Sequence, residues 1–351
     1  MDPFVYNALP GRVIFGSGTL ARVGDEMAAL GFTRAMLLST AGRRGDLAPL
    51  EAQLGERVAG VFAGAAMHTP VEVTAEALAA TKACGADCLI ALGGGSTTGL
   101  SKAIALRTDL PQIVIPTTYA GSEASPILGE TRDGVKTTQR SMRVLPEVIV
   151  YDVDLTLSLP PAMAVVSGIN AIAHAAEGLY APNANPMISM LAEDGVRALA
   201  RALPAIVADA GDRGARSDAL YGAWACGVTL GAVAMGLHHK LCHVLGGSFG
   251  LPHAETHTVI LPHALAYNAS AAPEAMTRLA RALGASDAPA ALFDLAKSLG
   301  APVSLKALGM PEDGLSKVVD QCLAAPPANP RALEHEALMA CLQDAFDGRR
   351  P

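Results

Sequence analysis

The chain has 351 residues, which is more than one average domain, so two domains are expected. Hydrophobic residues make up 51% of it and charged residues 17%, enough for buried cores, whereas an aromatic share of 4% argues against a stacking surface for bases. The formal net charge of -7 and the lack of a basic block offer no general attraction to phosphate backbones, so we expect no nucleic-acid partner.

The termini and the cysteines indicate the compartment. No apolar run in the sequence reaches the roughly 18 to 20 residues that span a bilayer. The N-terminal residues lack the basic-then-apolar layout of a signal peptide. Of six scattered cysteines only Cys84 and Cys88 lie close together, which favours small core residues in a reducing compartment. We therefore expect a cytoplasmic protein without a membrane partner.

The first half of the chain alternates short β-rich runs with helical patterns. Helices are expected over residues 20–30 and 71–84. Continuous apolar strands separated by helices are typical of a parallel sheet that is covered on both faces. Residues 1–160 are therefore predicted to form an α/β domain, with strands at residues 12–15, 35–39, 58–62, 88–92, 113–115 and 148–151.

The pattern changes after about residue 160. Long segments rich in Ala and Leu follow, with Gly and Pro mainly between them. No repeated strand pattern is found there. Residues 161–351 are therefore predicted to form an all-α domain, with helices that include residues 187–203, 219–236 and 274–283.

The strongest local signal is a glycine-rich turn between the strand at 88–92 and a helical segment. Glycines let a backbone approach a phosphate closely, Ser and Thr supply donors, and the helix N-terminus points free amides at an anion. The turn differs from the common G-x-G-x-x-G fingerprint, so a purely structural glycine-rich helix start is the alternative. The expected cofactor contacts here are Gly93, Gly94, Gly95, Ser96 and Thr97.

A second polar segment follows the strand at 113–115. Thr117 and Thr118 come directly after Pro116, and a turn at this place could close over the same cofactor. Taken alone, the segment is equally well explained as an ordinary polar turn. Thr117 and Thr118 are therefore kept as predicted cofactor contacts.

Histidines form the third constellation, because five of the nine fall within residues 238–257. On a helix His239 and His243 share one face, since they are four residues apart, and His253 would return after a short loop. Asn170 and His174 are a similar pair far upstream. Such clusters are typical of metal or acid–base chemistry, with structural histidines as the alternative.

These segments, in this order and at these separations, resemble the iron-dependent alcohol dehydrogenase superfamily, which shares its fold with dehydroquinate synthase and glycerol dehydrogenase. The combination GGGSTTGLSKA, PTTYAGSEA and HHKLCHVLGG is similar to the maleylacetate reductase branch. The resemblance covers essentially the whole chain. It implies a Rossmann-like dinucleotide-binding domain at 1–160, a helical domain with the histidine cluster at 161–351 and an active cleft between them. The implied activity is NAD(P)H-dependent reduction of the C=C bond of maleylacetate to 3-oxoadipate in aromatic degradation.

In that superfamily an aspartate and three histidines hold a metal. His174, His239 and His253 match the three histidines, but Asn170 stands at the aspartate position. An amide is neutral, so the site loses a full negative charge facing a divalent cation. We therefore expect that a metal is not required, with His174, His239 and His253 as its ligands if one binds. Gly99 is a second departure, because many metal-containing relatives carry Asp there.

The resemblance also assigns cofactor and substrate contacts. Relatives restricted to NADH often carry an acid at the end of the second strand, where this chain has Ser39 with two arginines nearby. Ser39 is thus a predicted cofactor contact, and both NADH and NADPH are expected. His243 is the first choice for proton donor or oxyanion stabiliser. His174, His239 and His253 would orient the substrate.

Several alternatives stay open at this point. Tyr119 and Lys136 are candidates for holding the dicarboxylate substrate. A metal-dependent alcohol or aldehyde dehydrogenase of the same superfamily is the main rival function, and a dehydroquinate synthase-like lyase that uses NAD transiently is another. A homodimer is expected from the superfamily and from the commonness of two-fold assemblies.

Overall fold

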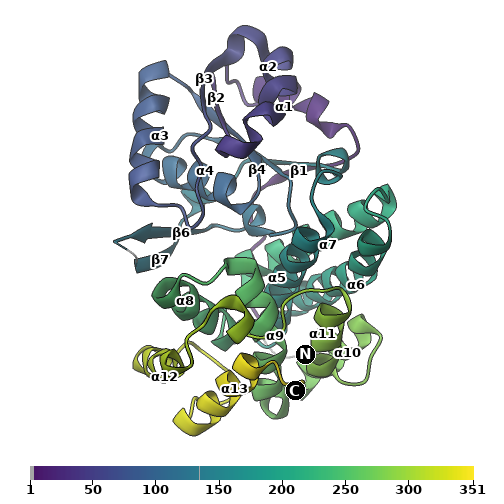
Figure 1. Ribbon diagram of the computed structural model, residues 1–351. Helices are drawn as coiled ribbons and strands as arrows, with labels where there is room; N and C mark the ends of the chain where they lie inside the picture. The colour runs from purple at the N-terminus through teal and green to yellow at the C-terminus, as the bar shows by residue number, and fades with distance from the viewer. Residues whose placement is uncertain (1–3, 134) are drawn as a thin grey trace. The chain divides into compact units, whose positions relative to one another are not determined.

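The computed structural model describes residues 4–133 and 135–351, without the side chain of residue 136 (Figure 1). The chain forms two compact units. One comprises Leu9–Leu159, and the other comprises Pro160–Pro351 together with residues 4–8. The functional division into a dinucleotide-binding domain at 1–160 and a domain with the histidine cluster at 161–351 stays a prediction, because contacts alone assign no function.

The first unit contains a six-stranded sheet in which all strands are parallel, in the order β1-β8-β5-β4-β2-β3. Four α-helices accompany it, so the predicted α/β fold is confirmed. The strands are β1 (Arg12–Gly16), β2 (Ala35–Leu38), β3 (Val58–Phe62), β4 (Cys88–Gly93), β5 (Gln112–Pro116) and β8 (Val148–Asp152), and the helices are α1 (Val23–Ala29), α2 (Ala48–Leu54), α3 (Val71–Cys84) and α4 (Gly95–Thr108).

Alternate residues of the strands feed two separate cores. On β4, Cys88, Ile90 and Leu92 belong to the core formed with α1 and α2. Leu89 and Ala91 belong to the core formed with α3 and α4. Because side chains alternate along a strand, an apolar residue at every position indicates that both faces are covered. Figure 1 shows these two helical layers on opposite sides of the sheet.

Two features of this unit differ from the prediction. The helix expected over residues 20–30 begins as a 3₁₀ turn at Thr19–Arg22 and becomes α-helical only at Val23. Asp152 accounts for the turn, since its carboxylate accepts the amides of Gly18 and Leu20 at 3.0 and 2.8 Å. An antiparallel hairpin, β6 (Ile127–Arg132) and β7 (Val135–Arg140), was not predicted. Its strands are largely polar, and the Asp-Gly pair at 133–134 is the sequence signal that could have found it.

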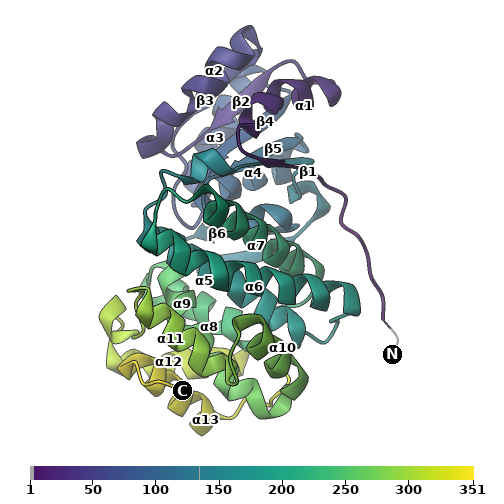
Figure 2. The same ribbon diagram turned by 90° about the vertical axis from the view of Figure 1, so that its right-hand side faces the viewer.

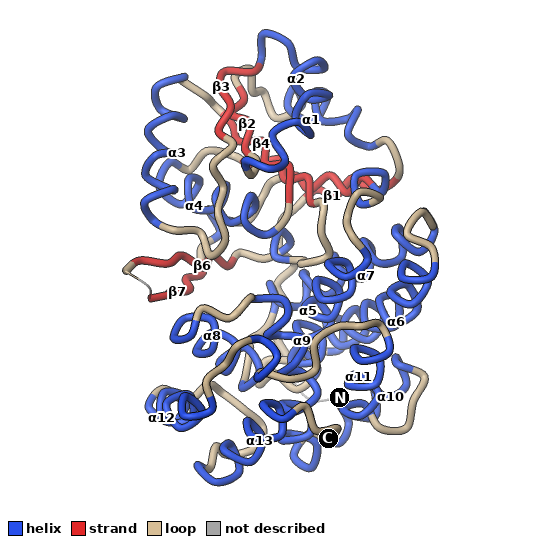
Figure 3. Tube along the Cα trace, viewed as in Figure 1, coloured by secondary structure: helices blue, strands red, loops and turns tan. Residues whose placement is uncertain are grey.

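The second unit is helical, as predicted, and the structure describes no strand within it (Figures 2 and 3). The helix expected over 219–236 ends at Ala232, and a new helix starts at Leu237. Nine α-helices make up the described part of the unit: α5 (Pro161–Leu179), α6 (Pro186–Ala208), α7 (Arg213–Ala232), α8 (Leu237–Phe249), α9 (His253–Asn268), α10 (Pro273–Leu283), α11 (Ala288–Ser298), α12 (Leu315–Ala324) and α13 (His335–Asp347).

Helix α5 is more apolar than the sequence analysis allowed. It has 19 residues and is long and apolar enough to cross a membrane by length and composition alone. Helices α7 and α8, taken together, are also long and apolar enough by length and composition, but the chain bends by 96° between them. However, 83% of an 18-residue stretch of α5 is buried inside the protein, where α5 packs against α6, α7 and α9. Such burial is typical of the core helix of a folded domain.

Candidate active site

The glycine-rich turn lies where two neighbouring strands send their connections in opposite directions. β2 connects to β3 on one side and β4 connects to β5 on the other, while β2 and β4 pair through Leu38 and Ala91. In open parallel sheets, ligands bind at such a switch point, outside the carboxyl ends of the strands. Ser39 directly follows β2 and Gly93 ends β4, so both predicted contacts border this position.

At two positions of the turn only glycine fits, because a side chain would collide with neighbouring residues. Gly93 has a φ of 154°, and a Cβ there would overlap the Thr97 hydroxyl. A Cβ on Gly94 would come within 2.8 Å of Thr118 Cγ2. The Gly94 carbonyl also accepts the amides of Thr97 and Thr98 at 3.1 Å each, which starts α4. Bare backbone is thus presented at a helix N-terminus, whose free amides favour a phosphate group.

The polar side chains beside this turn include an unsatisfied hydroxyl. Thr97 Oγ1 is buried and has no hydrogen-bond partner among the described residues. The Thr117 amide donates to the Gly93 carbonyl at 3.0 Å, which holds the second predicted segment next to the glycine turn. Gly95 and Ser96 form the first residues of α4. A phosphate oxygen would satisfy the Thr97 hydroxyl, because buried polar atoms rarely lack a partner.

The end of β2 offers less to a ribose than expected. Ser39 is fully buried, and its hydroxyl donates to the next carbonyl at 3.2 Å. Arg43 pairs with Asp46 at 2.8 Å and Arg44 pairs with Glu51 at 2.7 Å. Both arginines thus already have acidic partners. Both guanidinium groups are also partly exposed to solvent.

The two predicted substrate contacts of this unit remain untested. Tyr119 is fully buried. Lys136 lies in β7, and its side chain is outside the described part of the structure.

Gly99 is in contact with an unusual turn. A Cβ at this position would overlap the hydroxyl of Thr69. Thr69 and His68 have φ values of 48° and 62°, a conformation that residues with a side chain seldom adopt. The Thr69 carbonyl accepts the amide of Thr131 at 3.2 Å, which secures the turn. The room that an aspartate at position 99 would need is therefore filled by Thr69.

In the helical unit, the predicted histidines come together from α5, α8 and α9. The rings of His174 and His239 stack with centroids 5.0 Å apart, and His239 lies 6.2 Å from His243. His257 joins His253 to the group, with centroids 4.3 Å from His253 and 5.1 Å from His239. The structure thus assembles all four predicted histidines. Their roles in catalysis stay predictions.

Glu177 is a member of the site that the sequence analysis missed. It follows His174 by three residues on α5 and is completely buried. Its Oε2 lies 2.7 Å from Nδ1 of His239. Burial alone would raise the pKa of this carboxyl, but the bond to His239 and the amides of Gly236 and His238 together lower it. A lone carboxylate in an apolar helix, one turn from a candidate histidine, was the available signal.

His238 and His257 are two further members. His238 Nε2 and His257 Nδ1 are 2.9 Å apart, and the other nitrogen of each ring is buried without a partner among the described residues. Burial, followed by the neighbouring imidazoles, lowers the pKa of both rings well below the usual value. This pair is therefore neutral at physiological pH.

Asn170 carries another unsatisfied group. Its side chain is 4% exposed, and its Oδ1 has no hydrogen-bond partner among the described residues. A buried acceptor without a donor is unfavourable by about 1–3 kcal/mol. A ligand that donates a hydrogen bond would remove this penalty.

The residues present differ in chemistry from the metal site of the superfamily. Asn170 brings no charge, and the nitrogens of His174 and His239 lie 2.8 Å apart, whereas two ligands of a tetrahedral ion would be about 3.3 Å apart. This separation is that of a hydrogen bond between the two rings. His238, Cys242 and His257 also place donor atoms within 4.8 Å of one another. However, among the described residues the outer nitrogens of His238 and His257 have no hydrogen-bond partner, whereas metal-bound histidines almost always have one.

Comparison with known proteins decides the family. Residues 10–153 match the iron-containing alcohol dehydrogenase profile, and residues 164–346 match the C-terminal profile of the Fe-containing alcohol dehydrogenase family. Over 351 residues, the chain is 55% identical to the maleylacetate reductase of Rhizobium sp. (strain MTP-10005) and 56% identical to that of Burkholderia cepacia, covering 100% of each. The chain belongs to the maleylacetate reductase branch of the iron-containing alcohol dehydrogenase family.

Solved structures agree with this membership. The crystal structure of maleylacetate reductase from Agrobacterium tumefaciens is 56% identical, with a TM-score of 0.96 and coverage of 100% of both chains. An iron-containing alcohol dehydrogenase from Corynebacterium glutamicum is 41% identical, with a TM-score of 0.95 over 99% of this chain and 98% of its own. The expected fold, the oxidoreductase class and the NAD(P) dependence of the family are therefore confirmed. The similarity favours maleylacetate reduction over the metal-dependent alcohol dehydrogenase alternative.

Proposed function

We propose that this protein reduces the C=C bond of maleylacetate to give 3-oxoadipate, using NADH or NADPH. The observation that carries the proposal is the full-length identity of 55–56% to maleylacetate reductases, together with an asparagine where the superfamily's metal-binding aspartate stands. The product of such a reaction belongs to the breakdown of aromatic compounds.

The substrate is an enedioate whose ketone is conjugated to the C=C bond. Bound NAD(P)H supplies a hydride, which the carbon β to the ketone accepts. Negative charge then spreads over the ketone oxygen and the adjacent carbon as an enolate, and a proton completes the reduction. An ordinary carbonyl reduction places the charge on one alkoxide and gains strongly from a Lewis acid. With the charge delocalised, hydrogen-bond donors from the protein suffice.

The side chains of the cluster have distinct tasks in this scheme. We assign His243 the delivery of the proton or the stabilisation of the enolate oxygen. His174, His239 and His253 orient the dicarboxylate. The amide of Asn170 donates to a substrate oxygen. Tyr119 and Lys136 are candidates for the remaining carboxylate contacts, since a dianion needs charged or polar partners.

We further propose that turnover requires no metal. The uncharged side chains at the family's metal position and the hydrogen bond between His174 and His239 support this. We also propose a homodimer in the cytoplasm, with a small dicarboxylate as its only required partner besides the cofactor and with no role for nucleic acid or membrane. The absence of an acid at Ser39 supports acceptance of both NADH and NADPH.

The test is NADH oxidation with freshly generated maleylacetate, before and after exhaustive metal removal. We expect stoichiometric NADH loss and an unchanged rate after treatment with a chelator. Activity that vanishes and returns with iron or zinc would favour the metal-dependent alcohol dehydrogenase alternative. Turnover without net NADH consumption would instead indicate a lyase that uses NAD transiently.

A further inference from the structure

The buried carboxylate of Glu177 has contacts that determine its state. Oε1 accepts the amide of His238 at 2.7 Å, and Oε2 accepts the amide of Gly236 at 2.8 Å. Both oxygens thus receive hydrogen bonds from backbone groups that can only donate. These amides belong to the N-terminus of α8, where a helix favours negative charge. The carboxylate is therefore ionised and acts only as an acceptor.

An ionised Glu177 decides which nitrogen of His239 carries the proton. His239 Nδ1 lies 2.7 Å from Oε2, and an acceptor at that distance requires a hydrogen on Nδ1. In the neutral ring, Nε2 is then left with its lone pair. The tautomer of the neutral His239 ring therefore follows from Glu177, because only a hydrogen on Nδ1 can be donated to the carboxylate.

The same reasoning extends one ring further. His239 Nε2 lies 2.8 Å from Nδ1 of His174. Since Nε2 of His239 has only a lone pair to offer, Nδ1 of His174 must donate. The neutral His174 ring then has its lone pair on Nε2. Three side chains thus form an ordered chain in which every hydrogen points towards Glu177.

We propose that Glu177 is a positioning residue that sets the tautomers and ring orientations of His239 and His174 for the reduction. This inference rests on the proposed function for the reaction, although the tautomers themselves can be read without substrate. Glu177 acts through His239 and is not assigned a contact with substrate. Its position on α5 and its capping of α8 also fix the two helices that carry these histidines.

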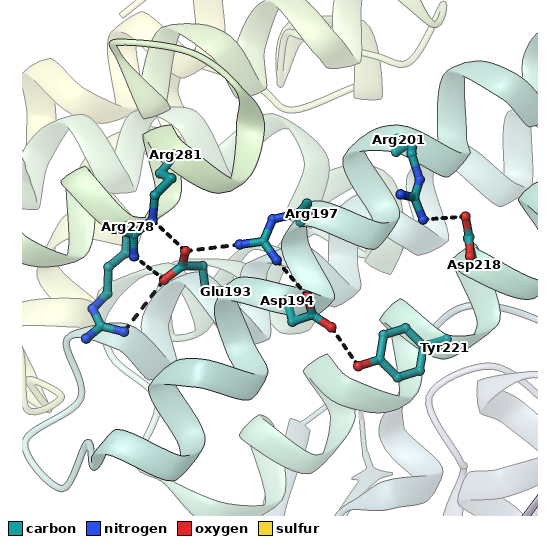
Figure 4. A network of polar contacts seen from close by, with 8 residues as sticks. All are labelled: Glu193, Asp194, Arg197, Arg201, Asp218, Tyr221, Arg278 and Arg281. Carbon is teal, nitrogen blue, oxygen red and sulfur yellow. Dashed lines mark hydrogen bonds and ion pairs between the residues drawn. The ribbon is translucent and has the colours of Figure 1, made fainter.

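The decisive variant is Glu177→Gln, which keeps the shape of the side chain. If the amide group of Gln faces His239, the ring must accept at Nδ1 and carry its proton on Nε2, which reverses the chain. Glu193→Gln is the matched control. Glu193 is also a buried carboxylate of the helical unit, held by Arg197, Arg278 and Arg281 on α6 and α10 and outside the histidine cluster (Figure 4).

The measurement is ¹⁵N NMR of histidine-labelled protein, with the His239 signals assigned by comparison with His239→Asn. In the wild type we expect a protonated Nδ1 on His239 and on His174. Glu177→Gln should put the His239 proton on Nε2 in the molecules whose Gln amine faces the ring, and should lower kcat by roughly 10²- to 10⁴-fold, as a wrong tautomer does in a serine protease. The KM for NADH should stay unchanged, and Glu193→Gln should alter neither the tautomers nor kcat.

Two results would overturn the inference. A proton on Nε2 of His239 in the wild type contradicts it directly, whether or not any variant folds. A Glu177→Asp variant that keeps the carboxylate should retain the wild-type tautomers and recover part of kcat relative to Glu177→Gln; equal losses would show a merely structural role. Lack of maleylacetate reduction by the wild type would refute the proposed reaction while leaving the tautomer result intact.

Discussion

Replacing Asn170 by Asp should destabilise the protein and make it respond to divalent cations. The side chain at position 170 is 4% exposed and its Oδ1 has no partner among the described residues, so a carboxylate there would be buried and unpaired. Desolvation raises the pKa of such a group. Each unit of that rise amounts to about 1.4 kcal/mol, so a rise of about two units removes roughly 3 kcal/mol at neutral pH.

The sign of the pH dependence follows from the raised pKa. The folded state of the variant binds its proton more tightly than the unfolded chain does. The penalty is therefore absent below the unfolded pKa of about 4 and grows as the pH rises to the folded pKa. At about 1.4 °C per kcal/mol for a chain of 351 residues, the variant should melt about 4 °C below the wild type at pH 8 and close to it at low pH.

A bound cation would reverse the loss by pairing with the new carboxylate and the nearby histidines. Zinc or iron(II) at about a hundred times its dissociation constant would add roughly 2.7 kcal/mol. The assay is thermal unfolding at pH 5 and pH 8, with and without each metal. Asn170→Ala is the control, because it removes the amide without adding charge. A wild type that gains as much from metal as the Asp variant, or an Asp variant without pH dependence, would refute the reasoning.

Three further predictions concern other parts of the chain. His243→Ala should lower kcat about 10²-fold with normal folding, and an unchanged kcat in steady-state assays would remove His243 from its assigned role. Burial lowers the pKa of His263 to about 4, so its neutral form contributes roughly 3 kcal/mol that is present above pH 6.5 and lost as the pH falls to 4. His263→Leu should therefore flatten the acid branch of urea unfolding curves, and an unaltered acid branch would contradict this. Gly99→Ala should destabilise by about 1–3 kcal/mol because its Cβ meets Thr69, whereas adding Thr69→Gly should restore most of the loss; additive effects of the two would show that they are not in contact.

Much of the fold could be predicted because local chemistry and tertiary structure agree. The strand at β4 is an unbroken apolar run that ends in glycines, and α3 spans the predicted 71–84 because Gly85 follows it with a φ of 64°. The hairpin β6–β7 was not predicted from the sequence, because its strands are mostly polar and lie outside the main sheet. The end of α7 at Ala232 was not predicted, because apolar residues continue past this point and the sequence has no strong helix-ending signal there.

The candidate site was predictable to the extent that it depends on helical spacing. His239 and His243 lie one turn apart on α8, and the three helices bring His174 and His253 to them. Glu177 was missed because its importance comes from contacts with the start of α8, about 60 residues away. A periodic pattern in the sequence does not show which backbone amides a buried carboxylate will contact. The same holds for the unsatisfied atoms of Asn170 and His257, which only three-dimensional packing reveals.

The destination of the hydride tests the central claim most directly. Maleylacetate should be turned over with NADH deuterated at the transferred position, and the product examined by NMR and mass spectrometry. We predict 3-oxoadipate with an intact ketone and one deuterium on the carbon that was β to that ketone. Deuterium on a carbinol carbon would show carbonyl reduction, as an alcohol dehydrogenase performs it, and would contradict the proposed function.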